Sequence, residues 1–114
     1  MTRNTKSQAA LSQQELDALR EMGARIRYAR KRRGQTLSSL AQRMLVTPKT
    51  LRRLEQGDPG VSLGLLVSAL YCLGLDHDLA SVAAPATDEI GQRHDSDRLA
   101  RIKRVRPPRE NLDF

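Results

Sequence analysis

The residues from Thr36 to Gly57 constrain the fold of this chain more than any other segment. They contain two short stretches with apolar residues at helical spacing, which are Leu37, Leu40, Ala41 and Met44, and then Leu51 and Leu54. A break at Leu45–Val46 precedes Thr47 and Pro48, which suit the N-cap and first turn of a helix. The glycines and proline at 57–60 are typical of a helix stop. The pattern predicts two short helices joined by a tight turn, the second from about Pro48 to Gln56.

The two helices are predicted to bury one apolar cluster between them, made of Leu40, Ala41, Met44, Val46, Leu51 and Leu54. This packing leaves a basic face on the second helix, and a helix of this kind fits the major groove of DNA. We expect Lys49 or Arg53 to pair with guanine, with Thr50 against a thymine methyl or a phosphate. A basic outer face alone is typical of an ordinary surface helix. What favours DNA binding is the setting of this helix, between the short helix that precedes it and the stop at Gly57 that follows it.

The remaining sequence predicts an all-α domain and no strand. A first helix covers about 14–33 and ends at Gly34, a fourth runs from the cap Ser62 to Gly74, and a short fifth covers about 77–83. The predicted organisation is a flexible arm at 1–13, a five-helix domain at 14–84 and a flexible, charged, partly disordered tail at 85–114, with a helical turn near 88–104.

Composition narrows the functional classes. The net charge of +7 favours polyanionic partners, while 3% aromatic residues argue against proteins that stack unpaired bases. No apolar run is long enough for a membrane span, no secretory signal is evident, and the single Cys72 suits a reducing cytoplasm. Neither His77 nor His94 has metal-ligand spacing around it, and Asp88 and Glu89 lack a catalytic setting. We therefore expect no enzyme, cofactor or metal site.

The chain resembles the lambda-repressor-like, XRE-type helix-turn-helix regulators over roughly residues 20–84. The matching positions are Ile26, Arg27, Arg30, Gly34, Thr36, Leu37, Leu40, Ala41, Val46, Thr47, Thr50, Leu51, Leu54, Glu55, Gly57, Leu70, Leu73, Gly74 and Leu75. The resemblance implies four or five helices and a homodimer on a palindromic double-stranded DNA operator. It places base contacts at Pro48, Lys49, Thr50 and Arg53, and a structural ion pair between Arg30 and Glu55.

Further contacts follow from this arrangement. We expect DNA phosphates to meet Arg30, Thr36, Thr47 and Arg52, and a dimer interface on the fourth and fifth helices to include Leu65, Leu75, Leu79 and Val82. Two residues depart from the family pattern. Leu45 stands where many members have glycine. If the backbone there is left-handed, leucine costs about 1–2 kcal/mol, so either the turn geometry differs or this cost is tolerated. Pro48 has no donor for a base, which shifts recognition toward Lys49 and Arg53.

Within this family, the stretch from Gly57 to Pro85 and the basic tail are similar to HipB-type antitoxins, which repress their own operon and hold a HipA-type Ser/Thr kinase toxin. The alternatives are a stand-alone regulator, such as a phage-type repressor or restriction–modification controller, and a protein-interaction module that inhibits an enzyme. The tail contains the basic run Arg98, Arg101, Lys103, Arg104, Arg106 and Arg109. Three interpretations of this run stay open: an arm along phosphates, a partner-binding segment and a solubilising tail.

Overall fold

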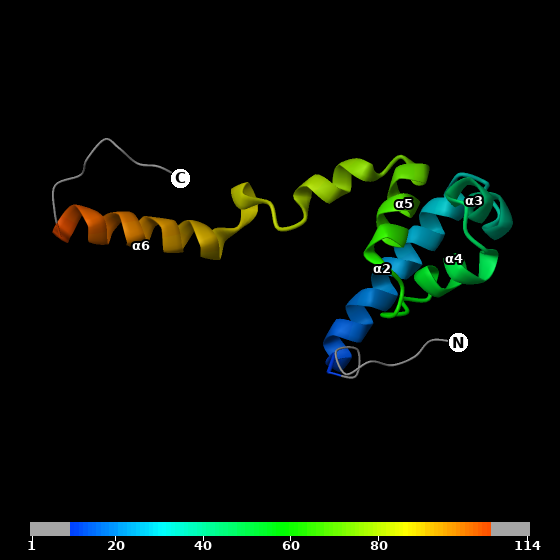
Figure 1. The fold of residues 1–114 in the computed structure, drawn as a ribbon, viewed down its shortest axis with the longest axis horizontal. Coiled ribbons are helices and arrows are strands. Elements are labelled where there is room, and N and C mark those ends of the chain that lie inside the picture. The colour runs from blue at the N-terminus through cyan, green and yellow to red at the C-terminus, as the bar shows by residue number, and fades with distance from the viewer. Residues whose placement is uncertain (1–9, 106–114) are drawn as a thin grey trace. The chain divides into compact units, whose positions relative to one another are not determined.

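The computed structural model of the chain describes residues 10–105, and every regular element in that range is helical (Figure 1). The α-helices are α2 (Gln13–Arg32), α3 (Leu37–Met44), α4 (Pro48–Glu55), α5 (Leu63–Leu73) and α6 (Glu89–Val105), with 3-10 helices η1 (Asp76–Ser81) and η2 (Pro85–Thr87). The predicted all-α class with a helix-turn-helix is confirmed. Residues 1–9 of the predicted arm, and Arg106 and Arg109 of the basic run, lie outside the described residues.

Hydroxyl side chains begin the four helices α2 to α5, because each accepts a hydrogen bond from a backbone amide of the first turn. These N-caps are Ser12, Thr36, Thr47 and Ser62. At α2 the Glu15 carboxylate also accepts from the Ser12 amide, 2.9 Å away, which closes a capping box. The hydrogen bonds from the amide and hydroxyl of Ser12 lower the pKa of Glu15. The predicted boundary between the arm and the first helix is therefore wrong by one residue, since Gln13 is already helical.

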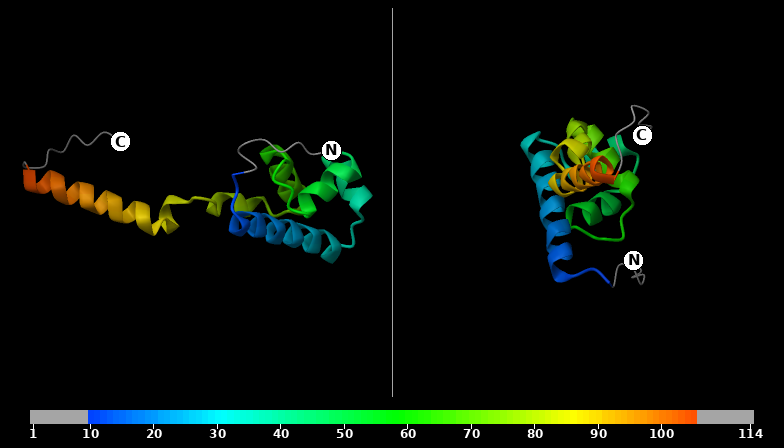
Figure 2. Two further views of the ribbon diagram at one scale, coloured as in Figure 1. Left: turned by 90° about the horizontal axis from the view of Figure 1, so that it is seen from below. Right: turned by 90° about the vertical axis from the view of Figure 1, so that its left-hand side faces the viewer.

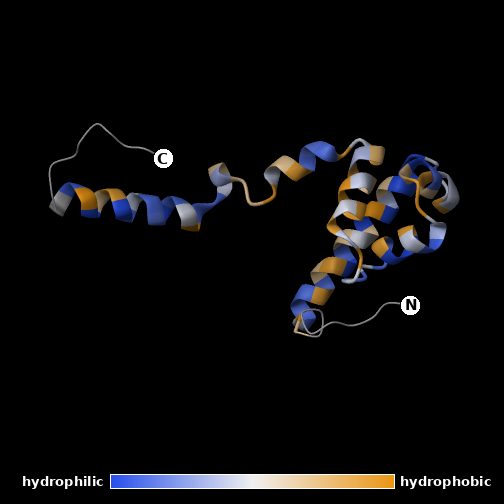
Figure 3. Ribbon diagram, in the orientation of Figure 1, coloured by the Kyte–Doolittle hydropathy of each residue, from blue (hydrophilic) through white to orange (hydrophobic). Residues whose placement is uncertain are grey.

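The described chain divides into two compact units, one reaching Leu79 and the other starting at Ala80. In the first unit α2 packs against α4 and α5, and α3 packs against the same two helices. Two further views show α2 along one side of the other helices (Figure 2). Figure 3 shows apolar residues interrupting the hydrophilic surface of α2 and α4, as amphipathic helices require.

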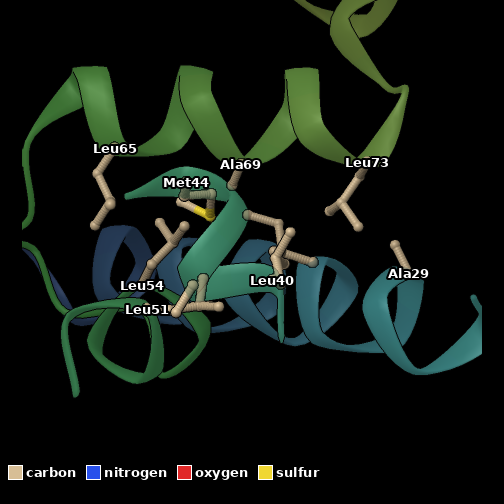
Figure 4. Packing of buried hydrophobic residues seen from close by; sticks show 10 residues of the cluster. Ala29, Leu40, Met44, Leu51, Leu54, Leu65, Ala69 and Leu73 are labelled. Carbon is tan, nitrogen blue, oxygen red and sulfur yellow. The ribbon is translucent and has the colours of Figure 1, made fainter. Parts of the chain in front are cut away.

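The core fills the space between these four helices (Figure 4). Its fully or nearly fully buried members include Ile26, Leu40, Ala41, Leu51, Leu54 and Ala69. Met44 is also buried and Val46 packs against the cluster from one side, so the predicted apolar contact between α3 and α4 is confirmed. Leu40 and Leu51 are 0% exposed, which places the centre of the core at the crossing of these two helices.

The core-facing side of α5 differs from the prediction. Leu65, Ala69 and Leu73 point into the core, while Leu63 is 76% exposed (Figure 4). Leu65 is thus wrong as a dimer-interface residue. α5 consists of LGLLVSALYCL, which is apolar on all sides, so hydrophobic spacing alone could not identify its buried face.

Two further elements also differ from expectation. The predicted fifth helix is the 3-10 helix η1, Asp76–Ser81, rather than an α-helix at 77–83. The region predicted to hold one helical turn forms the continuous helix α6, which is 17 residues long and largely hydrophilic (Figure 3). Asp88 accepts a hydrogen bond from the Gly91 amide at the start of this helix. The proposed tail at 85–114 is therefore more ordered, through Val105, than its composition indicates.

The backbones of α2 and α4 approach each other at Gly23, which is buried. A Cβ atom at Gly23 would lie 2.5 Å from the carbonyl oxygen of Glu55 and 2.6 Å from that of Leu54. Backbone atoms cannot move aside as a flexible side chain would. This glycine therefore sets the distance between the first helix and the second helix of the helix-turn-helix.

We predict that Gly23→Ala forces these helices apart and lowers the free energy of unfolding by about 3 kcal/mol, at the upper end of overpacking costs. Gly64→Ala is the matched control, because the nearest atom to its added Cβ would be the Ser62 Oγ at 3.9 Å. Urea unfolding followed by circular dichroism measures both. Equal stability of the two variants would contradict the close packing of α2 on α4.

Candidate nucleic-acid interface

The turn between α3 and α4 orients the candidate recognition helix. Leu45 caps α3 with φ 60° and ψ 39°, in the left-handed region. Its side chain is 91% exposed, so side-chain packing does not offset the backbone strain of about 1–2 kcal/mol. Of the two alternatives that the sequence left open at this position, the structure shows the left-handed backbone, with its cost tolerated. The Val46 amide then bonds to the Ala41 carbonyl over 3.0 Å, which leads the chain directly into α4.

Two hydroxyl groups lie at the N-terminus of α4. Thr47 Oγ1 accepts from the Thr50 amide over 3.1 Å, and the two hydroxyl oxygens are 2.8 Å apart. Pro48 occupies the first helical turn, and it lies at the surface. This terminus carries backbone amides and the positive end of the helix dipole, so it suits an anionic phosphate.

The outward face of α4 is made of residues at helical spacing. Lys49 and Arg52 are exposed, and Arg53 is partly exposed. Gln56, the exposed C-cap residue, continues this face one turn beyond Arg52 and Arg53. The structure therefore brings together the predicted contacts on α4 and adds Gln56. The sequence already placed Gln56 on the outer side of this helix, seven residues from Lys49, but did not predict it as a contact.

Arg53 has a carboxylate partner that sequence reasoning missed. Its Nε lies 2.9 Å from Asp58 Oδ2, and the two side chains are 31% and 18% exposed. Asp58 belongs to the segment that follows α4 and was interpreted only as part of a helix stop. Its side chain reaches back to α4 because the chain reverses after Gly57, which has φ 76°.

Arg30 and Glu55 form a buried ion pair between α2 and α4. The Arg30 Nε and one terminal nitrogen lie 2.7 and 3.0 Å from the two carboxylate oxygens, and the other terminal nitrogen donates to the Gln35 carbonyl over 2.9 Å. Each residue is 7% exposed. The hydrogen bonds to Glu55 raise the pKa of Arg30, against the opposing effect of burial.

This geometry corrects one predicted contact. Arg30 was expected to meet a DNA phosphate, but its guanidinium is buried and bonded to protein atoms in all three nitrogen positions. Arg27 and Arg52 are exposed beside it, and they line a surface depression together with Leu37, Gln56 and the edge of the Arg30–Glu55 pair. Arg27 lies 25 residues before Arg52 in the sequence, so only the packing of α2 on α4 reveals that they share a site.

The other predicted positions lie in varied surroundings. Thr36 is exposed at the start of α3 and caps Ser39. Leu75 packs against the core from one side, Leu79 is half-buried and Val82 is 72% exposed. Across residues 10–105 no cluster of side chains suitable for a metal ion is found. No helix within that range is long and apolar enough to cross a membrane.

We predict that Arg30→Met lowers the free energy of unfolding by about 3–5 kcal/mol, because it leaves the Glu55 carboxylate buried without its cation. The double variant Arg30→Met/Glu55→Met should recover most of this loss. Arg20→Met is the control, since the exposed pair of Arg20 with Asp17 is worth at most about 1 kcal/mol. Equal losses for the two single variants in chemical unfolding would refute the bracing role.

Comparison with known protein families identifies the domain. A family model described as a helix-turn-helix domain matches residues 21–82, which is more than half of the chain. Among solved structures, the clp gene regulator ClgR from Corynebacterium glutamicum is 32% identical, with a TM-score of 0.48, and the match covers 80% of this chain and 95% of that one. No curated protein matches the chain. DNA-binding transcriptional regulation is the function that this family match supports, and the chain belongs to the helix-turn-helix domain family.

Proposed function

We propose that this protein is a sequence-specific transcriptional repressor that inserts α4 into the major groove of double-stranded operator DNA. The observation that carries this proposal is the cationic outer face of α4, held on a rigid support by the core and by the Arg30–Glu55 pair. The opposite face buries Leu51 and Leu54, so the helix has a single possible orientation on the domain. The proposed place of action is the bacterial cytoplasm.

The residues of this surface fall into two groups. Lys49 and Arg53 are proposed to read base edges, with Thr50 and Pro48 in apolar or backbone contact. Phosphate contacts are proposed for Thr36, Thr47 and Arg52, to which the depression beside α4 adds Arg27. Phosphate contacts fix the register of the helix on DNA, while base contacts carry the sequence preference.

We predict that Lys49→Ala lowers affinity for the operator by about tenfold and leaves affinity for random DNA nearly unchanged, because it removes a base contact. Arg52→Ala should weaken both equally and reduce the slope of log affinity against log salt by about 1. Fluorescence anisotropy at fixed salt measures both, on an operator selected from random duplexes.

Arg25→Ala is the control for this series, since Arg25 is exposed on α2 and lies outside the proposed contacts. It removes one positive charge without removing a base contact. Unchanged operator affinity and unchanged base preferences in the double variant Lys49→Ala/Arg53→Ala would contradict recognition through α4.

The protein is further proposed to act as a homodimer through the outer face of α5. Leu63 is 76% and Tyr71 62% exposed, and Val67 and Leu70 are only half-buried between them. α5 contains no charged residue, so two copies could pair without burying an uncompensated charge. A two-fold dimer would place two copies of α4 about 34–36 Å apart, one turn of DNA. Leu75 and Leu79, which belong to the same compact unit as α5, stay in the proposed interface, and Leu65 leaves it. Val82 belongs to the second unit and is proposed as an interface residue on its own exposure alone.

We predict that Leu63→Glu converts a dimer into a monomer at micromolar concentration, because it places a carboxylate without a compensating charge in the apolar contact between the two copies. Leu45→Glu is the control, since Leu45 is equally large and even more exposed but lies in the turn before α4. Sedimentation velocity without DNA distinguishes them. A wild-type chain that sediments as a monomer with and without operator would exclude this interface.

The most specific proposal is that the chain is the autoregulating antitoxin of a HipA-type kinase toxin. Its support is the resemblance of the segment from Gly57 to Pro85 and of the basic tail to HipB-type proteins. The stand-alone regulator and the enzyme-inhibiting interaction module remain the alternatives. A kinase gene next to this gene, together with protection of the promoter of that operon by the protein, would favour the antitoxin. Protection without a kinase neighbour would favour the stand-alone regulator.

A further inference from the structure

Asp58 holds Arg53 on the proposed recognition face. Asp58 Oδ2 accepts from Arg53 Nε over 2.9 Å, and Asp58 Oδ1 accepts from the Gly60 amide over 2.7 Å. The Asp58 amide in turn donates to the Arg53 carbonyl over 3.0 Å. The carboxylate is therefore fixed through both oxygens and through its own backbone, and it is only 18% exposed.

The orientation of this ion pair matters because the guanidinium group is planar. The Asp58 carboxylate accepts the Nε–H of Arg53 and so occupies one edge of the planar guanidinium group. The opposite end, formed by one N–H from each terminal nitrogen, is a parallel pair of donors that matches guanine O6 and N7. Fixing Nε thus fixes the plane of the group and the direction of this donor pair.

Lys49 offers a contrast on the same face. Its ammonium group is a point charge on a flexible stem, and it presents no planar fork to a base. A side chain that is already ordered before binding loses less conformational entropy when it meets its target. Arg53 is therefore better suited than Lys49 to strict discrimination of one base.

We propose that Asp58 is a positioning residue that sets base specificity, holding Arg53 so that its terminal nitrogens read one guanine in each half-site. The inference rests on the proposed DNA-binding function and deepens it. Asp58 itself touches no base in this arrangement. Its carboxylate also repels nearby phosphates, so its removal is expected to raise affinity for all DNA slightly while it weakens the preference for guanine.

The test is the substitution Asp58→Asn in the full-length chain, which removes the charge and keeps the size of the side chain. Operators are first selected from random duplexes with the wild-type protein, and affinities are then measured for all single-base variants. The wild type should prefer guanine at one half-site position by about tenfold. Asp58→Asn should reduce this preference to about threefold or less and leave the other positions unchanged.

Two further variants separate positioning from general effects. Asp17→Asn is the matched control, because Asp17 also forms a 2.9 Å pair with an arginine, Arg20, but on the exposed surface of α2. It should leave every base preference unchanged. In an Arg53→Ala background, Asp58→Asn should not alter base preference further, since the residue that it positions is gone.

The outcomes distinguish this inference from the function on which it rests. A wild-type chain that selects no sequence would overturn both. A wild-type chain that selects an operator, with an Asp58→Asn variant that keeps its guanine preference or loses all preferences equally, would overturn the positioning role alone. Thermal unfolding of Asp58→Asn shows whether an equal loss of all preferences comes from a damaged fold, because a damaged fold would lower the melting temperature together with affinity at every position.

Discussion

The buried ion pair between Arg30 and Glu55 is the interaction on which the proposed recognition surface depends. It joins the last turn of α2 to the end of α4, and through the Gln35 carbonyl it also fixes the loop that leads into α3. Two buried charges are expensive unless both are fully hydrogen-bonded, so the pair tolerates only a narrow set of helix positions. Gly23 allows this arrangement, because α2 and α4 come into backbone contact there.

The same constraint divides the arginines of the chain into different roles. Arg30 is buried in its ion pair with Glu55, while Arg27 and Arg52 stay exposed beside it. Arg53 has an intermediate position, partly exposed and paired with Asp58. Net charge gives the protein a general attraction to DNA, but the surroundings of each guanidinium decide whether it can contact a phosphate or a base.

Much of the fold could be predicted from local signals. The caps Thr36, Thr47 and Ser62 and the stop after Gln56 place helix ends within a residue or two, because capping is a contact between near neighbours. Local signals did not identify the buried face of α5. Its apolar residues surround the helix, so Leu65 was assigned to the surface although it lies in the core. The length of α6 was underestimated for a related reason, since a polar helix has no apolar stripe to mark it.

The sequence by itself determined the helix-turn-helix and the side of α4 that faces outward, since both depend on residues a few positions apart. Only the tertiary structure decided that Arg30 is buried against Glu55, that Arg27 and Arg52 share a depression and which side of α5 is left uncovered. It also revealed the ion pair between Asp58 and Arg53. The physical reason is that the burial and the partners of a charged side chain depend on which helices meet, and spacing along one helix carries no information about its neighbours.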